Sequence, residues 1–449
     1  MSAHLNDTTM AETRELPRVL GLFDVVGILV GTVIGSGIFI VPATVAAQVH
    51  APSLILSVWV VGGVLSFFGA LAFAELGAMY PQAGGMYVYL RESFGRLIAF
   101  LFGWALFLVI DSGSIAALSM AFASKYLPYF VPLSPWGIKA VALVFIAVLT
   151  AINYVGTRYG AAVQNLLMVI KLGAIVAVSI IVFAFGDGTA AHFTSPAASA
   201  MTGGLISAFG VALVATLWAY KGWEATTFSA GELRNPQRDL PLGMLGGTAI
   251  VIGLYLLANG AYLWVLPASQ IATSSRVAAD AMRVAVGAAG AGFIAFIILF
   301  SITGAANGNL LTAPRVFFAM SRDGLFFERF GRVHERFLTP HVSVLATGIW
   351  AAVLSLSGTF EQLAAYVIFG QWVFLGLTVT GVMVLRRTRP EVARPYRTWG
   401  YPVTPALFLL VSAWIVINTL LTTPGRALAG LGLIALGLPF YWYWSTKRA

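Results

Sequence analysis

The sequence is dominated by apolar runs long enough to cross a lipid bilayer as helices, which need about 20 residues each. Charged residues make up only 10% of the 449 residues, against about 25% in a typical soluble domain, and the mean hydropathy is +0.88. The runs lie at 20–48, 53–79, 96–124, 136–154, 161–185, 203–230, 242–266, 288–319, 341–358, 361–385, 403–423 and 426–445. They predict an all-α polytopic membrane protein of about 12 transmembrane helices and exclude a soluble enzyme.

The distribution of positive charge predicts the orientation of these helices. If the N-terminus is cytoplasmic, 18 of the 26 Lys and Arg residues fall on the cytoplasmic side and five in outward-facing loops. Cytoplasmic loops of membrane proteins carry such an excess of Lys and Arg. We therefore expect an even number of spans, both termini in the cytoplasm, and a location in the inner (plasma) membrane of the cell. The net charge of +9 has the same cause, so no nucleic-acid partner is expected.

Several functions are excluded by residues that the sequence lacks. The chain has no cysteine, so we expect no disulfide-linked partner subunit and no thiolate metal site. Its five histidines show no metal-ligand spacing on one helix, so no metal or other cofactor is expected. No G-x-x-x-x-G-K-[ST] loop is present, which excludes ATP-driven pumping by this chain alone. A secondary transporter, a channel, a receptor or an intramembrane enzyme remains.

The first span contains a run of small residues that is poor material for a helix. In GILVGTVIGSGIFIVP, Gly35, Ser36 and Gly37 fall in the middle of the span. One explanation is close helix packing through small residues four apart, such as Gly27 and Gly31. The other is a helix unwound at 35–37, whose free backbone N–H groups and half-helix N-terminus face an anion.

The sixth span repeats this pattern in the stretch ATLWAYKGWEATTFSAGEL. Gly222 lies near its middle, next to Lys221 and close to Glu224. An ionisable residue at membrane depth is costly, and it is a functional candidate for that reason. Two interrupted spans, five helices apart, are typical of transporters built from inverted repeats with a substrate site near the midplane.

Four stretches resemble amino acid permeases of the APC superfamily, in particular the bacterial relatives of the L-type amino acid transporters. They are VGTVIGSGIFIVP, FAELGAMYPQAGGMYVYLRESFG, LWAYKGWEATTFSAGELRNPQRDLP and ANGNLLTAPRVFFAMSRDGLFF. The resemblance implies a LeuT-like fold, in which two inverted repeats of five helices precede two further helices and the first and sixth helices are unwound. The implied ranges are a cytoplasmic N-terminal segment at 1–19, the first repeat at 20–185, the second at 203–385, helices 11 and 12 at 403–445 and a cytoplasmic tail at 446–449.

The resemblance also implies where a substrate binds. In such permeases, backbone N–H groups of the broken first helix hold the α-carboxylate, and carbonyls of both broken helices hold the α-ammonium. A zwitterion in a dry site needs both ends paired, and this arrangement pairs both. The implied residues are Val33, Ile34, Gly35, Ser36, Gly37 and Ile38 in the first span, and Trp218, Ala219, Tyr220, Lys221 and Gly222 in the sixth. An aromatic residue of the sixth span is expected to close over the substrate.

Lys171 lies deep in the fifth span, among apolar neighbours. Its ammonium could snorkel to the cytoplasmic interface. The resemblance implies instead that it replaces the sodium ion of sodium-coupled members of the wider fold and braces the first helix against the fifth and eighth. Sodium-independent transport follows from that assignment. Asn307 in the eighth span is expected to contact either the substrate or Lys171.

Three other ionisable residues at membrane depth leave alternatives open. Lys221 and Glu224 could neutralise each other as an i,i+3 pair, or Glu224 could be a gate or a proton-sensitive carboxylate. Lys221 departs from the small, apolar or acidic residue of many relatives, and it either points away from the substrate or extends the site toward acidic side chains. Asp111 in the third span is a structural carboxylate, paired with Lys221, or else a substrate-amine contact or proton carrier.

The sequence therefore predicts a secondary-active amino acid transporter that works by alternating access. A sodium-independent exchanger or permease of neutral L-amino acids is the leading hypothesis, and a proton-coupled symporter is the alternative. An intramembrane enzyme or receptor is less well supported, because the deep carboxylates Asp111 and Glu224 lie on separate helices with no histidine. The expected partners are an amino acid substrate and the lipid bilayer.

Overall fold

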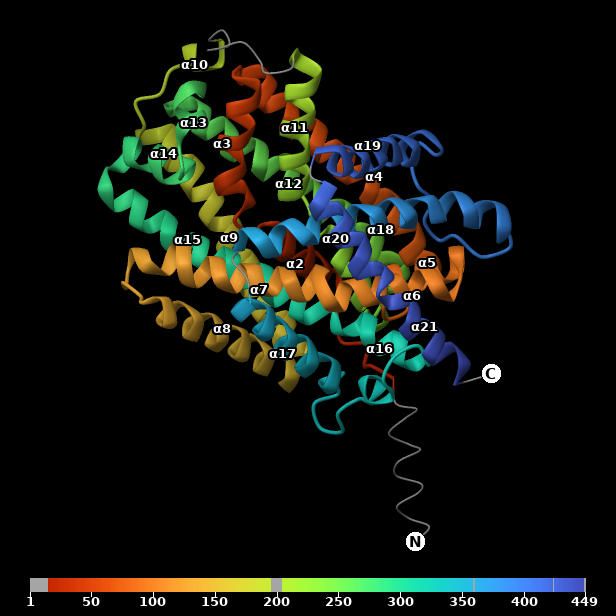
Figure 1. Ribbon diagram of the computed structural model, residues 1–449. Helices are drawn as coiled ribbons and strands as arrows, with labels where there is room; N and C mark the ends of the chain where they lie inside the picture. The colour runs from red at the N-terminus through yellow and green to blue at the C-terminus, as the bar shows by residue number, and fades with distance from the viewer. Residues whose placement is uncertain (1–14, 195–203, 358–359, 423, 448–449) are drawn as a thin grey trace.

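The computed structural model describes residues 15–194, 204–357, 360–422 and 424–447, and within these ranges the chain is a bundle of helices (Figure 1). The helices of the first half are α2 (Leu22–Val33), α3 (Gly37–Val49), α4 (Pro52–Met79), α5 (Met86–Phe94), α6 (Arg96–Ala105), α7 (Asp111–Ala121), α8 (Pro135–Val155), α9 (Thr157–Phe185), α10 (Ala191–Thr194) and α11 (Gly204–Ala219). Those of the second half are α12 (Pro236–Val265), α13 (Ala268–Thr273), α14 (Val277–Val286), α15 (Ala288–Thr312), α16 (Pro314–Arg322), α17 (His341–Ser357), α18 (Phe360–Thr388), α19 (Val403–Thr422), α20 (Pro424–Ala435) and α21 (Gly437–Thr446). Five short π or 3-10 turns are η1 (Leu106–Ile110), η2 (Phe122–Tyr126), η3 (Leu127–Tyr129), η4 (Trp223–Glu232) and η5 (Glu328–Gly331).

The described residues contain nine helical segments that are long and apolar enough to cross a membrane, or ten if α2 and α3 count as one bent span. The predicted ninth span corresponds to α17, which has only 17 residues, and the tenth corresponds to α18. An all-helical, multi-pass membrane protein is therefore confirmed. The total of 12 spans stays a prediction.

The two ends of the described chain lie on the same side of the bundle. Leu16 packs in a small apolar cluster with Phe318. Near the other end, the Trp444 ring lies 5.5 Å from that of Phe326 and 5.1 Å from that of Phe327, centroid to centroid. Because both ends contact the segment 318–327, the arrangement agrees with an even number of spans.

The first predicted span consists of two helices. α2 ends at Val33, α3 begins at Gly37, and the two are bent by 46°. The break at 34–36 begins one residue before the predicted 35–37. The packing explanation also holds for the two glycines named with it: a Cβ at Gly27 or Gly31 would lie within 2.2 Å of an α9 side-chain atom, so these two let α2 pack closely on α9.

The sixth span is broken as well, and its break lies against the first. α11 ends at Ala219, residues 220–222 form a turn, and η4 continues the chain. Gly222 has a φ of +120°, and a Cβ there would lie 3.0 Å from the Thr32 side chain. A Cβ at Gly37 would lie 3.0 Å from the Cα of Ala219. Glycine is therefore required where the two broken segments cross.

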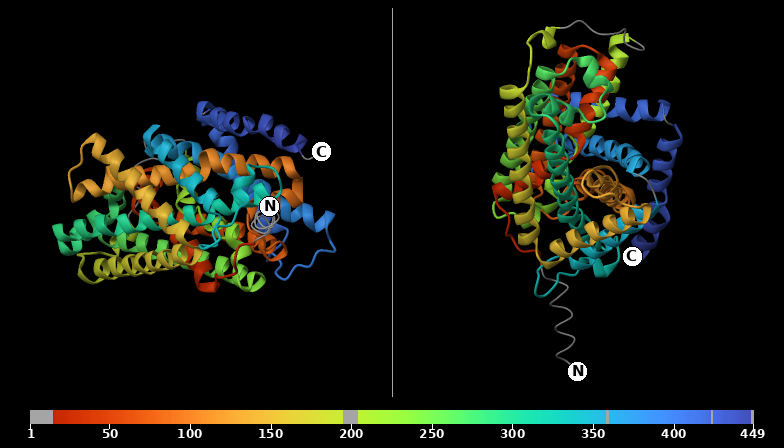
Figure 2. Two further views of the ribbon diagram at one scale, coloured as in Figure 1. Left: turned by 90° about the horizontal axis from the view of Figure 1, so that it is seen from below. Right: turned by 90° about the vertical axis from the view of Figure 1, so that its left-hand side faces the viewer.

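Helices α7, α9, α12 and α15 surround this crossing, because α2 packs against α9, α12 and α15, and α15 packs against α7. The third span reaches it through a distortion: the π-helical turn η1 ends at Ile110, and Asp111 follows directly as the first residue of α7. A π turn inside an α-helix shifts the face that later residues present and often lies at a functional site. The C-terminal helices α19–α21 lie at one edge of the bundle (Figure 2).

Candidate functional site

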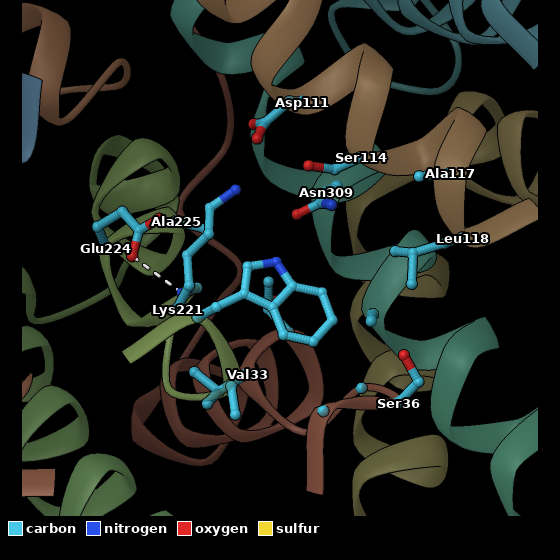
Figure 3. Close-up of a pocket in the computed structure, with 17 residues that line it drawn as sticks. Val33, Ser36, Asp111, Ser114, Ala117, Leu118, Lys221, Glu224, Ala225 and Asn309 are labelled. Carbon is cyan, nitrogen blue, oxygen red and sulfur yellow. Dashed lines mark hydrogen bonds between the residues drawn. The ribbon is translucent and has the colours of Figure 1, made fainter. Parts of the chain in front are cut away.

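A cavity lies where the two broken segments meet α7 and α15 (Figure 3). Its volume is about 100 Å³. An engineered apolar cavity of roughly 150 Å³ admits benzene, so this space suits a ligand of few non-hydrogen atoms. The lining residues are Thr32, Val33, Gly35, Ser36, Gly37, Asp111, Ser114, Ala117, Leu118, Trp218, Ala219, Lys221, Gly222, Glu224, Ala225, Ala305 and Asn309.

The start of α3 presents free backbone donors beside the cavity. Within the described chain, the N–H groups of Ser36, Gly37 and Ile38 donate no hydrogen bond, whereas the Gly35 N–H donates to the Val33 carbonyl over 2.9 Å. The first N–H groups of a helix lack an intrahelical acceptor, and with the helix dipole they favour an anion. The cavity therefore offers an anion site at 36–38, while the Gly35 N–H, which was also predicted to contribute, is already engaged.

Backbone carbonyls of both broken segments converge on Tyr255 of α12. The Tyr255 hydroxyl oxygen lies 3.2 Å from the Val33 carbonyl oxygen and 3.0 Å from that of Ala219. A tyrosine hydroxyl has one proton, so it donates to only one of the two carbonyls at a time. The Val33 carbonyl also accepts from the Gly35 N–H, but a carbonyl oxygen has two lone pairs, so the carbonyl that Tyr255 does not bond can still accept from a cationic group at the edge of the cavity.

Lys171 of α9 fills the space behind the first break. Its side chain is 1% exposed, and Nζ donates to the carbonyls of Gly31 over 2.6 Å and of Ile34 over 2.7 Å. The Ser301 hydroxyl of α15 lies 3.0 Å from the carbonyl oxygens of both Ile34 and Gly35. These donors satisfy carbonyls that lose their helical partners where α2 ends, and they join α2 to α9 and α15. That the ammonium replaces a sodium ion stays a prediction.

Glu224 and Lys221 follow each other closely in sequence but face different partners. Oε2 of Glu224 accepts from the Gly222 N–H over 3.1 Å, and Oε1 accepts from Nε2 of Gln371 over 2.6 Å. In the described structure no hydrogen bond or ion pair within 4.0 Å joins Glu224 to Lys221, whose ammonium points to the other side of the cavity (Figure 3). The considered i,i+3 pair does not form, because residues 220–222 are a turn and helical spacing does not apply.

Asp111 lies across the cavity from the broken first segment (Figure 3). Its side chain is 6% exposed, and its Oδ2 has no hydrogen-bond partner among the described residues. No ion pair within 4.0 Å links it to Lys221 there either. An unpaired buried acceptor costs about 1–3 kcal/mol, so a partner from a ligand would stabilise this position.

Asn307, predicted to touch the substrate or Lys171, makes its contacts elsewhere. Its amide group donates to the Gly160 carbonyl over 3.2 Å and to Oε1 of Gln164 over 2.8 Å, and its Oδ1 accepts from Asn153. These partners lie on α8 and α9, outside the cavity lining. Asn309, two residues later on α15, lines the cavity instead.

Three other predicted residues lie behind the cavity wall. The side chains of Ile34 and Ile38 are fully buried and do not line the cavity. Their backbone groups still contribute, because the Ile34 carbonyl accepts a hydrogen bond from Lys171 and the Ile38 N–H donates none in the described chain. Tyr220, a candidate gate, is 1% exposed, and its hydroxyl donates to the Trp59 carbonyl over 3.2 Å. Of the aromatic residues considered as gates, Trp218 is the one that lines the cavity.

Sequence reasoning missed several polar residues that shape this site. They are uncharged side chains within ordinary apolar spans, and no motif or spacing marks them. Their importance comes from which carbonyl or carboxylate they meet, which only the packing reveals. They are Thr32, Ser114, Tyr255, Ser301, Asn309 and Gln371.

Together, two interrupted spans that cross at a small cavity, with helix-end donors on one side and carbonyls on the other, define a membrane transport protein for a small charged or zwitterionic solute. The described residues contain no group of three His, Asp or Glu side chains that could hold a metal ion. Residues 20–437 match the sequence model of the family described as amino acid permease, and the chain belongs to that family.

Curated relatives match along almost the whole chain. The b(0,+)-type amino acid transporter 1 of Homo sapiens is 35% identical over 96% of this chain and 88% of its own length. The serine/threonine exchanger SteT of Bacillus subtilis (strain 168) is 33% identical over 98% and 99%, respectively. The cystine/glutamate transporter of Homo sapiens is 31% identical over 97% and 87%. The resemblance drawn from the sequence is confirmed, and the chain is an amino acid transporter.

Proposed function

We propose that the chain exchanges small neutral L-amino acids across the cell membrane by alternating access, without sodium. The observation that carries the proposal is the pairing of opposite polarities in one cavity. The free N–H groups at 36–38 suit an α-carboxylate, and the carbonyls of Val33 and Ala219 suit an α-ammonium. A zwitterion that leaves water for such a site keeps both ends hydrogen-bonded.

Size and charge support a small neutral substrate. The cavity of about 100 Å³ leaves little room beyond the backbone atoms of an amino acid. Its charged side chains include both signs, namely Asp111 and Glu224 on one hand and Lys221 on the other. The name of the Bacillus subtilis relative, serine/threonine exchanger, agrees with a small substrate and with exchange.

Sodium independence rests on Lys171. Its ammonium donates to the carbonyls of Gly31 and Ile34 at the first break, at a position where an oxygen-coordinated cation would otherwise sit. A covalently attached cation at this place removes the need for a dissolved one. The proposal includes 12 spans in a LeuT-like arrangement with both termini cytoplasmic, which the shared side of the two described ends supports.

Proton-coupled uptake is the second candidate, because two carboxylates line the cavity. Asp111 has an unpartnered oxygen, and Glu224 accepts hydrogen bonds that a change in protonation would alter. Exchange and proton coupling differ in one measurable respect. A proton-coupled carrier concentrates substrate in empty vesicles under a pH gradient, whereas an obligatory exchanger requires substrate inside.

A thermal-shift measurement with matched ligands tests the binding geometry. A ligand at 100 times its Kd stabilises the folded protein by about 2.7 kcal/mol. L-Alanine should raise the melting temperature of the purified protein, whereas its methyl ester, which lacks the carboxylate, and propionate, which lacks the ammonium, should not. Equal stabilisation by all three would show that the two broken segments do not hold the two ends of the substrate.

A further inference from the structure

Two charged side chains in the cavity are left without direct partners by the protein itself. Oδ2 of Asp111 has no hydrogen-bond partner among the described residues, although the side chain is 6% exposed. The Lys221 ammonium also makes no hydrogen bond or ion pair within 4.0 Å in the described structure, and it points toward the side of the cavity where Asp111 and Asn309 lie (Figure 3). The carboxylate of Asp111 and the ammonium of Lys221 thus face the same part of the cavity without forming an ion pair.

Two other polar side chains nearby, Glu224 and Ser114, are already committed. Both Glu224 oxygens accept hydrogen bonds, from Gly222 and from Gln371. The Ser114 hydroxyl donates to the Ile110 carbonyl over 2.6 Å, so its proton is used. The charged groups still open to a ligand are therefore one carboxylate, which only accepts, and one ammonium, which only donates, and the uncharged side chains of Thr32 and Asn309 line the same cavity.

We infer that Asp111 and Lys221 form a side-chain subsite that selects amino acids whose short side chain both donates and accepts a hydrogen bond, namely hydroxyl or carboxamide side chains. This inference rests on the proposed function. The substrate's backbone ends bind the broken segments, and its side chain extends between Asp111 and Lys221. A hydroxyl donates to Asp111 and accepts from Lys221, so it completes both groups at once.

Other side chains fail at this subsite for distinct reasons. In valine, a methyl group in the position of the threonine hydroxyl leaves a carboxylate and an ammonium unpaired, and unpaired buried groups carry a large cost. A site built to bind a hydroxyl rejects the analogue that lacks it far more strongly than an apolar pocket rejects an added methylene. A carboxylate side chain meets Asp111, and an ammonium side chain meets Lys221, so each faces a like charge.

Competition with shape-matched amino acids tests the inference. Purified full-length protein in liposomes preloaded with unlabelled L-alanine takes up labelled L-alanine, and external L-threonine or L-valine competes. These two side chains have nearly the same shape and differ by hydroxyl against methyl. Threonine should inhibit at a concentration at least tenfold lower than valine in the wild type, and in Asp111→Ala the ratio should fall below threefold. The control Asp280→Ala, on α14 and outside the cavity lining, should keep the wild-type ratio.

A gain of function provides a second readout that misfolding cannot mimic. In Lys221→Met, Asp111 loses its facing cation, so the short cationic L-2,4-diaminobutyrate should compete at least tenfold better than it does in the wild type. Equal inhibition by threonine and valine in an active wild type would overturn the proposed subsite. So would an Asp111→Ala variant that loses alanine binding and threonine binding to the same extent, because that result would place the α-ammonium on Asp111. Absence of any amino acid exchange by the wild type would instead contradict the proposed function.

Discussion

Replacing Lys171 by methionine should weaken substrate binding much more than it weakens the fold. Methionine fills similar volume but cannot donate to the carbonyls of Gly31 and Ile34, which lie 2.6 and 2.7 Å from Nζ. After the change, the Gly31 carbonyl has no donor in the described structure, since the Gly35 N–H that a continuous helix would supply donates to Val33. The first break loses both contacts from Lys171 and keeps only the Ser301 hydroxyl beside the carbonyls of Ile34 and Gly35.

The size of the effect follows from the two lost contacts. A hydrogen bond from a charged donor contributes about 1.5–3 kcal/mol, so two contribute at least about 3 kcal/mol to the broken geometry. At about 1.4 kcal/mol for each factor of ten, the apparent affinity should fall roughly 100-fold. The melting temperature is a poor measure of this change. The variant no longer has a buried ammonium, and the removal of that desolvation penalty of several kcal/mol offsets the lost hydrogen bonds.

The assay is equilibrium binding of labelled L-alanine to detergent-solubilised protein, after size-exclusion chromatography shows that each variant is monodisperse. Lys139→Met serves as the matched control, because Lys139 lies on α8 near the Trp136 ring and away from the breaks. The control should bind as the wild type does. If Lys171→Met binds alanine within threefold of the wild type, the ammonium does not maintain the break, and the argument is wrong.

Four further substitutions probe other parts of the site. In an equilibrium binding assay, Gly37→Ala should reduce alanine binding at least tenfold, because the added Cβ would lie 3.0 Å from the Ala219 backbone. Gly35→Ala should change binding much less, because its Cβ would meet only the Ala305 side chain, at 3.7 Å. Equal losses in the two variants would contradict this. Tyr255→Phe removes the hydroxyl shared by Val33 and Ala219 and should lower the melting temperature by an amount that corresponds to about 1–3 kcal/mol; an unchanged melting curve would show that the bridge contributes nothing. Glu224→Gln should leave the exchange rate and its pH profile unchanged. The new amide can still accept one hydrogen bond, and Gln371 can turn its unpartnered Oε1 toward the new amino group. A flattened pH profile would support proton coupling instead.

Sequence reasoning predicted the parts of the fold that depend on local composition. Glycine and serine in the middle of an apolar run indicated the break after Val33, and the structure places it within one residue. The turn at Gly222 was indicated in the same way. Both predictions succeed because the conformation of these segments is dictated by residues that do not continue a helix.

Predictions failed where a residue's role depends on contacts between distant helices. Helical spacing suggested a pair between Lys221 and Glu224, but the turn that Gly222 creates removes that spacing. Asn307 and Asn309 look alike in the sequence, and only the rotation of α15 decides that the second lines the cavity. Tyr255 is one aromatic residue among many in an apolar span, so nothing local marks it as the bridge between the two breaks.

The central claim is that this chain exchanges amino acids through the cavity where its two broken spans cross. Counterflow in proteoliposomes tests it most directly, with labelled L-alanine outside and either unlabelled L-alanine or no amino acid inside. The account predicts uptake that depends on internal alanine, persists when choline replaces sodium, and falls to the level of empty liposomes in Gly37→Val. Uptake that requires sodium, or that is the same with and without internal alanine, would contradict it.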